Sequence, residues 1–377
     1  MKSLALTSPL NWRDRLAAWH DRLVASADFR RWAGRFPLTR GMARRRARAL
    51  FDLAAGFVYS QVLYACVRLD LFTILAEGPQ EERALAHRLS LPADAAAQLL
   101  EAAESLGLTK RRNGRWALGQ LGAVMVGNAA IESMVKHHAM LYADLTDPVA
   151  LLRGERGGGK LAAYWPYAGV ERPEALGDAD VAPYTALMAA SQPMISSEVL
   201  DAYDFSKHRC LLDVGGGDGS FLRAVASAHP ALNVILFDLP AVAARAEARF
   251  AAAGMANRAR AVGGDFHAGI LPEGADIISF VRVLHDHDEE DVARMLRAAH
   301  AALPQGGTLL VAEPMAETPG AEAMGAAYFG FYLRAMGTGR PRTPARLSAM
   351  LEAAGFRQPR LLPTATPLLT RVLVASA

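Results

Sequence analysis

The amino-acid sequence predicts an α/β protein in which a mostly helical N-terminal domain precedes a doubly wound sheet. From Arg209 onward, short apolar strands alternate with helical segments, which is the pattern of a doubly wound α/β domain. Before that point helical periodicity dominates, and Asn113-Gly114 gives a strong hairpin signal. The length of 377 residues is sufficient for two domains with substantial cores.

These patterns divide the chain into four parts. They are a basic helical arm over residues 1–50, a winged-helix domain over 51–135, connecting helices over 136–200 and the α/β domain over 201–377. A glycine-rich loop, Gly154–Gly159, interrupts the connecting helices. The apolar content of 52% is typical of a globular protein, and the net charge of +3 is too small to indicate a nucleic-acid partner by itself.

The positive charge is concentrated in the arm. Residues 1–50 contain eleven arginines and one lysine against three aspartates, and the densest part is residues 43–48. A solvated helical face is one interpretation. Attraction to an anionic membrane surface is a second, because each basic residue near such a surface contributes roughly 1 kcal/mol. Contact with nucleic acid is a third.

Three helices followed by a hairpin outline a winged helix. We expect the helices over residues 51–78, 82–90 and 93–108, and the hairpin over 109–119. A winged helix can bind DNA, and the wing would offer Lys110, Arg111, Arg112 and Arg115. It can also serve as a dimerisation module. The expected recognition helix favours dimerisation, because phosphate would be repelled by its acids Asp94, Glu101 and Glu104.

Cysteine content and apolar runs predict a cytoplasmic protein. Cys66 and Cys210 lie in apolar runs and are expected to be small core residues, as in a reducing compartment. The Met1–Leu10 segment lacks the apolar core and cleavage site of a signal peptide. The most apolar stretch, Leu53–Val67, contains Ser60 and Gln61 and is too short to span a bilayer.

A glycine-rich turn follows the first expected strand of the α/β domain. Five strands are expected over residues 210–214, 233–238, 259–265, 276–283 and 307–313, and a closing pair in the C-terminal tail. Gly215, Gly217 and Gly219 follow the first strand, where glycines let the backbone approach a ligand closely. A dinucleotide fingerprint would place its third glycine at Ser220, so this spacing suits S-adenosylmethionine better than NAD.

Three acids end three successive strands, where open α/β sheets bind their ligands. Asp213 ends the first strand. Asp238, followed by Leu239, ends the second and could accept hydrogen bonds from a ribose diol, although a helix cap is the alternative. Asp265 could face the adenine amine, with Phe266 covering the ring; a turn residue is the alternative for Asp265. These residues predict a cofactor site.

The chain resembles the caffeate-type O-methyltransferases, which use S-adenosylmethionine. DVGGGDG, FDLP, GGDF, LHDHDEE and LLVAEPM occur in that family's order over roughly residues 50–377. The resemblance implies a class I Rossmann-like catalytic domain, an N-terminal winged-helix dimerisation domain and a homodimer. Within the family, residues 55–72, RVLHDHDEED and the 312–343 segment are similar to the carotenoid hydroxyl methyltransferases of purple photosynthetic bacteria, which implies the tertiary 1-hydroxyl of an acyclic carotenoid as acceptor.

The run Val283–Asp291 holds the expected base. His285 occupies the family's catalytic-histidine position, and a neutral imidazole can take a hydroxyl proton near pH 7. The resemblance implies that Glu313 orients this ring, whereas Pro341 stands where plant relatives have a second glutamate, so one carboxylate or Asp286 would hold the base. His287 replaces a tryptophan and is expected to be a packing or polar-contact residue. The following acids, chiefly Asp288 and Glu290, are expected to stabilise a helix start.

Alternatives remain for the metal, the acceptor and the function. Two histidines two residues apart without a third ligand make a weak metal site, so no metal is expected. Residues 326–337 are aromatic and could be core, a dimer contact or the wall of a pocket for a long apolar substrate. The pocket would be lined by Met188, Met194, Tyr328, Phe329 and Tyr332. A phenolic or tetrapyrrole acceptor is the alternative substrate, and a DNA-binding regulator is the alternative function.

Overall fold

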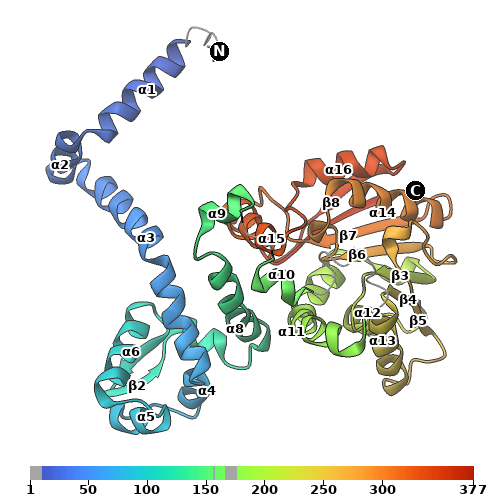
Figure 1. The fold of residues 1–377 in the computed structure, drawn as a ribbon, viewed down its shortest axis with the longest axis horizontal. Coiled ribbons are helices and arrows are strands. Elements are labelled where there is room, and N and C mark those ends of the chain that lie inside the picture. Colours follow the sequence, from blue (N-terminus) through green and yellow to red (C-terminus); the bar gives the residue numbers. More distant parts are fainter. Residues whose placement is uncertain (1–10, 156–157, 166–175) are drawn as a thin grey trace. The chain divides into compact units, whose positions relative to one another are not determined.

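The structure of the protein is a computed structural model that describes residues 11–155, 158–165 and 176–377. Met1–Leu10 and part of the glycine-rich Gly154–Gly159 loop lie outside the described residues. The chain forms two compact units, Met1–Val126 and Gly127–Ala377. Each unit is built from its own elements (Figure 1).

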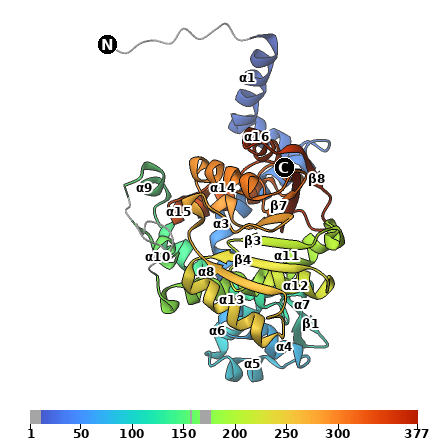
Figure 2. The ribbon, with the colours of Figure 1, turned by 90° about the vertical axis from the view of Figure 1, so that its right-hand side faces the viewer.

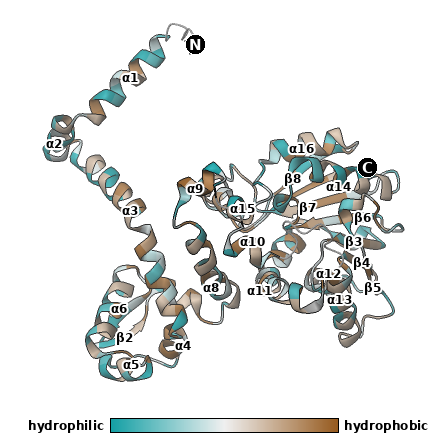
Figure 3. Ribbon diagram, viewed as in Figure 1, coloured by the Kyte–Doolittle hydropathy of each residue, from teal (hydrophilic) through white to brown (hydrophobic). Residues whose placement is uncertain are grey.

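The first unit begins with the basic arm. It contains α1 (Trp12–Ala25), α2 (Ala27–Arg35) and the first part of α3 (Arg40–Arg68). Asn11 and Ser26 cap α1 and α2 by accepting backbone N–H groups of their first turns. Hydrophilic and hydrophobic turns alternate along α1 (Figure 3), because its apolar residues share one stripe.

The rest of the first unit is a small helical domain with a hairpin. After α3 come α4 (Leu71–Ala76), α5 (Glu82–Arg88), α6 (Ala93–Ser105), β1 (Thr109–Arg112), β2 (Arg115–Leu118) and α7 (Gln120–Met125). The hairpin turns at Asn113 and Gly114, whose φ angles of 51° and 78° are the left-handed values that a type I′ turn requires. The expected helix over residues 51–78 is wrong in one respect, because Asp70 adopts φ 53° and divides it into α3 and α4.

The acidic neighbours of the wing neutralise part of its charge. Arg111 forms an ion pair with Glu82 and Arg115 with Glu81. The Glu104 carboxylate accepts the backbone N–H of Arg111 at 3.0 Å. These contacts favour a structural role for the hairpin over phosphate binding.

Helix α3 is longer and more exposed than the apolar stretch within it. Its 29 residues include a window of mean hydropathy 1.5, and 11% of that window is buried. Among the described residues it is the one helix whose length and composition would allow it to cross a membrane. Length and composition alone are weak evidence for a span, and six of its large apolar residues are exposed: Met42, Leu50, Phe51, Leu53, Phe57 and Val58.

The second unit opens with the connecting helices. They are α8 (Ala129–Asp144), α9 (Pro148–Arg153), α10 (Lys160–Tyr164) and α11 (Asp178–Ala202). The buried Asp144 carboxylate accepts the backbone N–H groups of Lys160 and Leu161 at 2.8 and 2.7 Å, which caps α10. These helices pack with residues near the end of the chain, because Leu141, Leu161 and Tyr184 share one apolar cluster with Tyr332 and Met336.

A seven-stranded sheet forms the body of the second unit. Its strands are β3 (Cys210–Val214), β4 (Asn233–Asp238), β5 (Ala259–Gly263), β6 (Ile277–Val281), β7 (Thr308–Glu313), β8 (Arg357–Leu362) and β9 (Arg371–Ser376). Their order is β5-β4-β3-β6-β7-β9-β8, and only β9 runs antiparallel to its neighbours. Figure 2 shows β3 and β4 side by side. This mixed sheet confirms the predicted α/β class.

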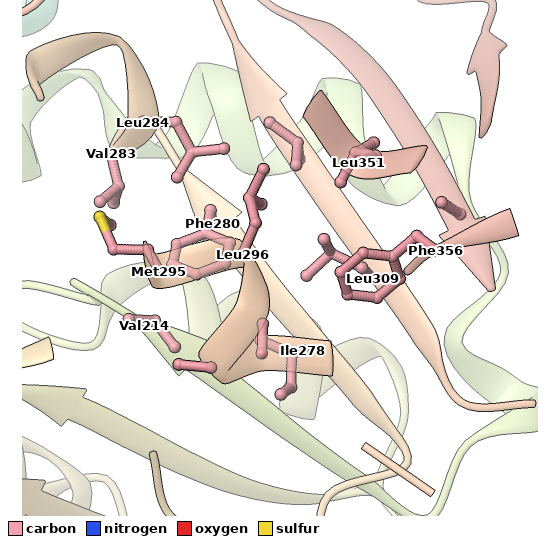
Figure 4. Packing of buried hydrophobic residues seen from close by; sticks show 14 of the residues in the cluster. Val214, Ile278, Phe280, Val283, Leu284, Met295, Leu296, Leu309, Leu351 and Phe356 are labelled. Atoms are coloured by element: carbon pink, nitrogen blue, oxygen red, sulfur yellow. The ribbon is translucent and has the colours of Figure 1, made fainter. Parts of the chain in front are cut away.

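Helices cover both faces of the sheet. One apolar cluster joins the strands to α14 (Glu289–Ala302) and α16 (Pro344–Ala353), and a second joins them to α12 (Ser220–Ala228) and α13 (Pro240–Ala252). Figure 1 shows these pairs on opposite sides of the sheet. Val283 and Leu284 pack into the first cluster beside Met295 and Phe280 (Figure 4). The chain is thereby anchored immediately before His285.

Strand β6 ends two residues earlier than the sequence indicates. The apolar pattern predicts a strand through Val283, but β6 stops at Val281. Arg282 adopts φ 58°, which turns the backbone out of the sheet. The short 3₁₀ turn η4 (Leu284–Asp286) follows and carries His285.

Candidate active site

A cavity of about 330 Å³ opens at the carboxyl ends of β3, β4, β5 and β6. Such an edge is where open α/β sheets bind ligands, and this volume lies at the low end of ligand pockets. The predicted cofactor residues are brought together there: Asp213, Gly215, Gly217, Asp238, Leu239, Asp265 and Phe266 all line it. Of the predicted substrate residues, Met188 lines the same cavity.

The glycine loop after β3 lies against the loop that leads to His285. Gly215 has φ 70°, and a Cβ atom there would stand 2.8 Å from a methyl group of Val283. Only glycine fits both the left-handed backbone and this close approach. The backbone N–H of Gly217 donates to Asp238 Oδ2 at 2.8 Å, which ties the loop to the end of β4.

Two buried carboxyl groups face the cavity beneath this loop. Burial raises the pKa of Asp238 to about 6, although the N–H groups of Gly217 and Leu239 oppose the rise. Burial, together with the nearby Asp238, raises the pKa of Asp213 to about 7 against a hydrogen bond from Ser279 Oγ. Each oxygen of Asp238 accepts one backbone N–H and keeps a further lone pair for a ligand. The N-cap of α13 is Leu239 rather than Asp238.

Aromatic and imidazole rings form the next part of the wall. Asp265 accepts the backbone N–H of His267 and caps η3 (Phe266–Ala268), so it is a turn residue that also lines the cavity. His287 packs edge-on against Phe266 and His267, with ring centroids 5.3 and 4.9 Å away. Burial and the neighbouring His267 lower the pKa of His287 to about 3, so this ring is neutral.

His285 lies between two carboxylates. Its Nδ1 is 3.2 Å from Glu313 Oε2, and the same oxygen accepts the backbone N–H of His285 at 3.0 Å. Its Nε2 is 3.1 Å from Asp286 Oδ1. All three side chains are buried, and of the three only Asp286 lines the cavity. The acidic run therefore divides: Asp286 is a partner of His285, whereas Asp288 is the N-cap of α14 and Glu289 and Glu290 lie in its first turn.

The two carboxylates control the protonation of His285. Burial lowers the pKa of the imidazole, but Asp286 and Glu313 more than offset this and leave the pKa raised. Burial in turn raises the pKa of Asp286 to about 7. Both shifts have the sign expected for an imidazole and a carboxyl group that share a proton in a dry site. When neither His285 Nε2 nor Asp286 carries that proton, the pair can accept one from a ligand hydroxyl.

Three of the other predicted substrate residues are aromatic rings that lie together, and two of them are hydrogen-bonded through their hydroxyl groups. Tyr328 and Phe329 belong to η5 (Met324–Phe329), and Tyr332 belongs to α15 (Gly330–Met336). The Tyr328 hydroxyl is 2.7 Å from His138 Nε2, and the Tyr332 hydroxyl is 2.9 Å from His137 Nε2. Phe329 meets the ring of His285 edge-on at 5.9 Å.

These rings and Met194 are not among the residues that line the cavity. The structure thus brings the predicted cofactor residues and Met188 into one site. It places Tyr328 and Tyr332 in the adjoining apolar cluster, against which Met188 also packs.

The sequence did not indicate Arg282 as a site residue. Its guanidinium donates to Ser191 Oγ at 2.6 Å, to the Met188 carbonyl at 2.9 Å and to Gln192 Oε1, and it lines the cavity. Those partners lie about ninety positions earlier in the chain. The available signal was a single arginine in an apolar strand, followed two positions later by the histidine motif.

Comparisons with known proteins agree with this architecture. The O-methyltransferase domain family matches residues 142–357, and the O-methyltransferase dimerisation domain matches residues 51–128. The chain belongs to the O-methyltransferase family. The dimerisation domain indicates that this O-methyltransferase is a homodimer. The substrate of the enzyme is a small molecule. The class I methyltransferase fold expected from the resemblance is confirmed.

Two curated relatives match this O-methyltransferase over most of its length. The demethylspheroidene O-methyltransferase of Cereibacter sphaeroides is 41% identical over 94% of this chain and 93% of the relative. That of Rhodobacter capsulatus is 42% identical over 90% and 85%. Among solved structures, human N-acetylserotonin methyltransferase in complex with SAM aligns with a TM-score of 0.71 and 25% identity over 88% of this chain and 97% of that one.

Proposed function

We propose that this O-methyltransferase transfers the methyl group of S-adenosylmethionine to the tertiary 1-hydroxyl of an acyclic hydroxycarotenoid. The observation that carries the proposal is the similarity to two demethylspheroidene O-methyltransferases over nearly the whole chain. The site supports it, because five aspartates line the cavity, one of them, Asp286, contacts the buried imidazole of His285, and an aromatic, apolar cluster adjoins the cavity. A long hydrocarbon acceptor suits such a wall.

The cavity residues fit the cofactor. Asp238 would accept hydrogen bonds from the ribose hydroxyls with its free lone pairs, and Leu239 would lie beside them. Asp265 and Phe266 would hold the adenine, and Asp213 with the loop of Gly215 and Gly217 would hold the methionine end. When it is bound, S-adenosylmethionine supplies an electrophilic methyl group on a sulfonium. Asp213 and Asp238, when ionised, would counter that positive charge.

His285 acts as the general base. The acceptor hydroxyl would approach through the cavity face of Asp286, and the coupled Asp286–His285 pair would take its proton as the new C–O bond forms and the methyl–sulfur bond breaks, which leaves a neutral thioether. Glu313 fixes the orientation of the ring through Nδ1. No free alkoxide is needed, since proton removal accompanies methyl transfer. Alignment of the hydroxyl with the methyl group supplies the remaining rate enhancement.

The aromatic wall forms the acceptor chamber. Tyr328 and Tyr332 present ring surface while their hydroxyl groups are hydrogen-bonded to His138 and His137, and Phe329 adds a ring without a polar group. Phe329 lies against His285 and connects this wall with the base. Met188 and Met194 on α11 provide unbranched side chains that adapt to a polyene.

Incubation of the full chain with labelled S-adenosylmethionine and a 1-hydroxycarotenoid tests the proposal. The expected result is a labelled methyl ether. His285→Ala is expected to lower turnover about 10²- to 10⁴-fold and to retain cofactor affinity, because the imidazole acts in proton transfer alone. The matched control, His87→Ala on exposed α5, retains full activity. The absence of a labelled product, or undiminished turnover in His285→Ala, contradicts the proposal.

The arm gives the enzyme a peripheral contact with the anionic cytoplasmic face of the inner or photosynthetic membrane. Trp12, Leu16 and Trp19 lie on one stripe of α1 and are 69%, 57% and 57% exposed. Arg15 and Arg22 flank that stripe at helical spacing, which is the composition of an interfacial helix. On α2, the rings of Trp32 and Phe36 stack with centroids 4.9 Å apart and are partly exposed. A membrane is where a carotenoid acceptor dissolves.

Vesicle sedimentation tests this contact. The wild-type chain is expected to bind vesicles that contain phosphatidylserine, less tightly at high salt, and a Trp12→Ala/Leu16→Ala/Trp19→Ala variant is expected to bind at least about tenfold less tightly. Ile270→Ala removes an exposed apolar residue of the other unit and serves as control. Equal partition of the wild type and the triple variant refutes the membrane contact and leaves the catalytic proposal standing.

A further inference from the structure

The loop that carries the base has few hydrogen bonds of its own. The turn η4 contributes the Asp286 N–H bond to the Val283 carbonyl at 3.1 Å and the His287 N–H bond to the Leu284 carbonyl at 3.2 Å. The turn then ends, so it leaves the carbonyl groups of His285, Asp286 and His287 without partners of its own. Buried backbone carbonyls require such partners, and a loop without them would not hold an imidazole in one place.

A distant segment supplies these partners. We name residues 338–342 the clamp segment. The Arg340 N–H donates to the His285 carbonyl at 2.9 Å, and the Thr338 hydroxyl donates to the Asp286 carbonyl at 2.8 Å. The Arg342 guanidinium donates to the carbonyls of Leu284 and His287, both at 2.7 Å. Every carbonyl from residue 284 to residue 287 thus accepts a hydrogen bond from the clamp segment.

Arg342 is the central group of the clamp segment. Its side chain is 2% exposed, and its two terminal nitrogens reach both ends of the loop at once. The planar fork of a guanidinium can bridge two acceptors in this way, whereas the ammonium of lysine is a point donor. Burial of a charge is costly, so the geometry of these bonds is a specific feature rather than a by-product of packing.

The clamp segment is held close on both sides. A Cβ atom on Gly339 would lie 2.3 Å from the His285 carbonyl oxygen, so only glycine permits this approach. On the other side, the Ala316 N–H donates to the Arg342 carbonyl at 2.9 Å. Ala316 follows Glu313 by three residues, and the clamp segment therefore connects the loop of the base with the loop of its orienting carboxylate.

We propose that Arg342 is the positioning residue of the base, holding the loop of His285 and Asp286 against Glu313 through the backbone. The resemblance places a second ring-orienting glutamate at Pro341, and here the neighbouring arginine fixes the backbone instead of the ring. This inference rests on the proposed role of His285 as general base. It adds a residue that touches neither cofactor nor acceptor.

Arg342→Lys tests the inference in the full-length enzyme. It keeps the charge but cannot bridge both carbonyls, so kcat is expected to fall about 100-fold, as for a misplacement of about 1 Å. The affinity for S-adenosylmethionine and the KM for the acceptor are expected to stay within about twofold, because their contacts are elsewhere. Arg346→Lys is the matched control, since Arg346 pairs with Glu289 on the exposed surface of α16.

Titration of His285 separates a positioning role from a merely structural one. In the wild type, the NMR-detected imidazole is expected to titrate above the ordinary histidine range, and in Arg342→Lys the midpoint is expected to move down as the ring leaves its carboxylates. Guanidinium ions are expected to restore part of the turnover of Arg342→Ala. Thr338→Val removes the single hydrogen bond to the Asp286 carbonyl and is expected to lower the His285 midpoint by a smaller amount. This variant replaces the Arg342 variants in the test if those do not fold.

The outcomes decide between the two proposals. An unchanged midpoint in Arg342→Lys and Thr338→Val, or equal losses of kcat and cofactor affinity without a shift in midpoint, overturns the positioning role. The titration needs no acceptor. A wild-type enzyme that fails to methylate the 1-hydroxycarotenoid would therefore overturn the proposed function while the positioning of His285 is still measured.

Discussion

The contacts on both ring nitrogens of His285 determine how the activity of the enzyme depends on pH. The base must be unprotonated before it can accept a proton, and the carboxylates of Asp286 and Glu313 raise the pKa of the imidazole against the effect of burial. The ascending limb of kcat/KM is therefore expected above the ordinary imidazole range. A neighbour that stabilises the imidazolium orients the base and also delays its deprotonation as pH rises.

Glu313→Gln separates these two effects. A neutral amide no longer stabilises the imidazolium, so the ascending limb of kcat/KM is expected to move to lower pH. The plateau of kcat/KM is expected to fall about 10- to 100-fold, because the variant loses one charge-assisted hydrogen bond. Initial rates from pH 5 to 9 measure the position of the ascending limb and the height of the plateau. Glu322→Gln, an exposed carboxylate of the following loop, is the control. A limb that moves to higher pH would contradict the assignment.

Asp238 gives cofactor binding a pH dependence of its own. Burial raises the pKa of this carboxyl to about 6, so at lower pH it becomes protonated and accepts ribose hydroxyls less well. The affinity for S-adenosylmethionine is expected to fall as pH decreases below about 6. In Asp238→Asn the affinity for S-adenosylmethionine is expected to be about 10- to 100-fold weaker. It is also expected to depend less on pH, because the amide does not titrate. Calorimetry at pH 5 and pH 8 checks this, and an equal pH dependence in both proteins would refute it.

At the scale of the element, two loops at the sheet edge support each other. The glycine loop after β3 packs on Val283, and Val283 and Leu284 are anchored in the core behind η4 (Figure 4). A change in the cofactor loop is therefore transmitted to the loop that carries the base. This packing explains why the two functional halves of the site lie on neighbouring strands, β3 and β6.

Gly215→Ala tests this mutual support. The new methyl group is strained in the left-handed backbone by about 1–2 kcal/mol and would also displace Val283. We expect weaker cofactor binding together with a lower kcat. Gly254→Ala has a similar φ of 69° but no neighbouring atom within 4 Å, so it shares the strain without the collision. Equal activities of the two variants would show that the loops do not support each other.

The elements differ in how far the sequence could predict them. Strands β3 and β4 begin and end at the residues expected, because each is a buried apolar run bounded by glycine or a polar residue. The end of β6 was missed because the left-handed Arg282 is held by residues of α11 far away in the chain. The sequence offered Asp286 as an alternative holder of the base, whereas the bonds of Arg342 to the base loop have no local signature.

At the scale of the whole molecule, exposed apolar residues of α3 fit the homodimer. Phe51, Leu53 and Phe57 are 65%, 81% and 61% exposed in one protomer, within the dimerisation domain. Burial of such side chains stabilises an association by roughly 1.5–3 kcal/mol each. The second copy is therefore expected to cover these side chains of α3.

Phe57→Glu is expected to convert the homodimer to a monomer, since a charge in a covered apolar face is unpaired. Light scattering after size exclusion measures the mass against the 40.4 kDa of one chain. Ile270→Glu places the same charge at a 77% exposed position of the other unit and is expected to leave the dimer intact. A dimeric Phe57→Glu variant would place the dimer contact elsewhere.

The division of labour around His285 has a consequence for enzyme engineering. The base is fixed by the core and the clamp segment, whereas Tyr328 and Tyr332 are fixed by hydrogen bonds to His138 and His137 on α8. The residues proposed to shape the acceptor chamber are thus supported separately from those proposed to perform proton transfer. Exchange of these tyrosine–histidine pairs can widen the range of acceptors, while the chemical step keeps its machinery.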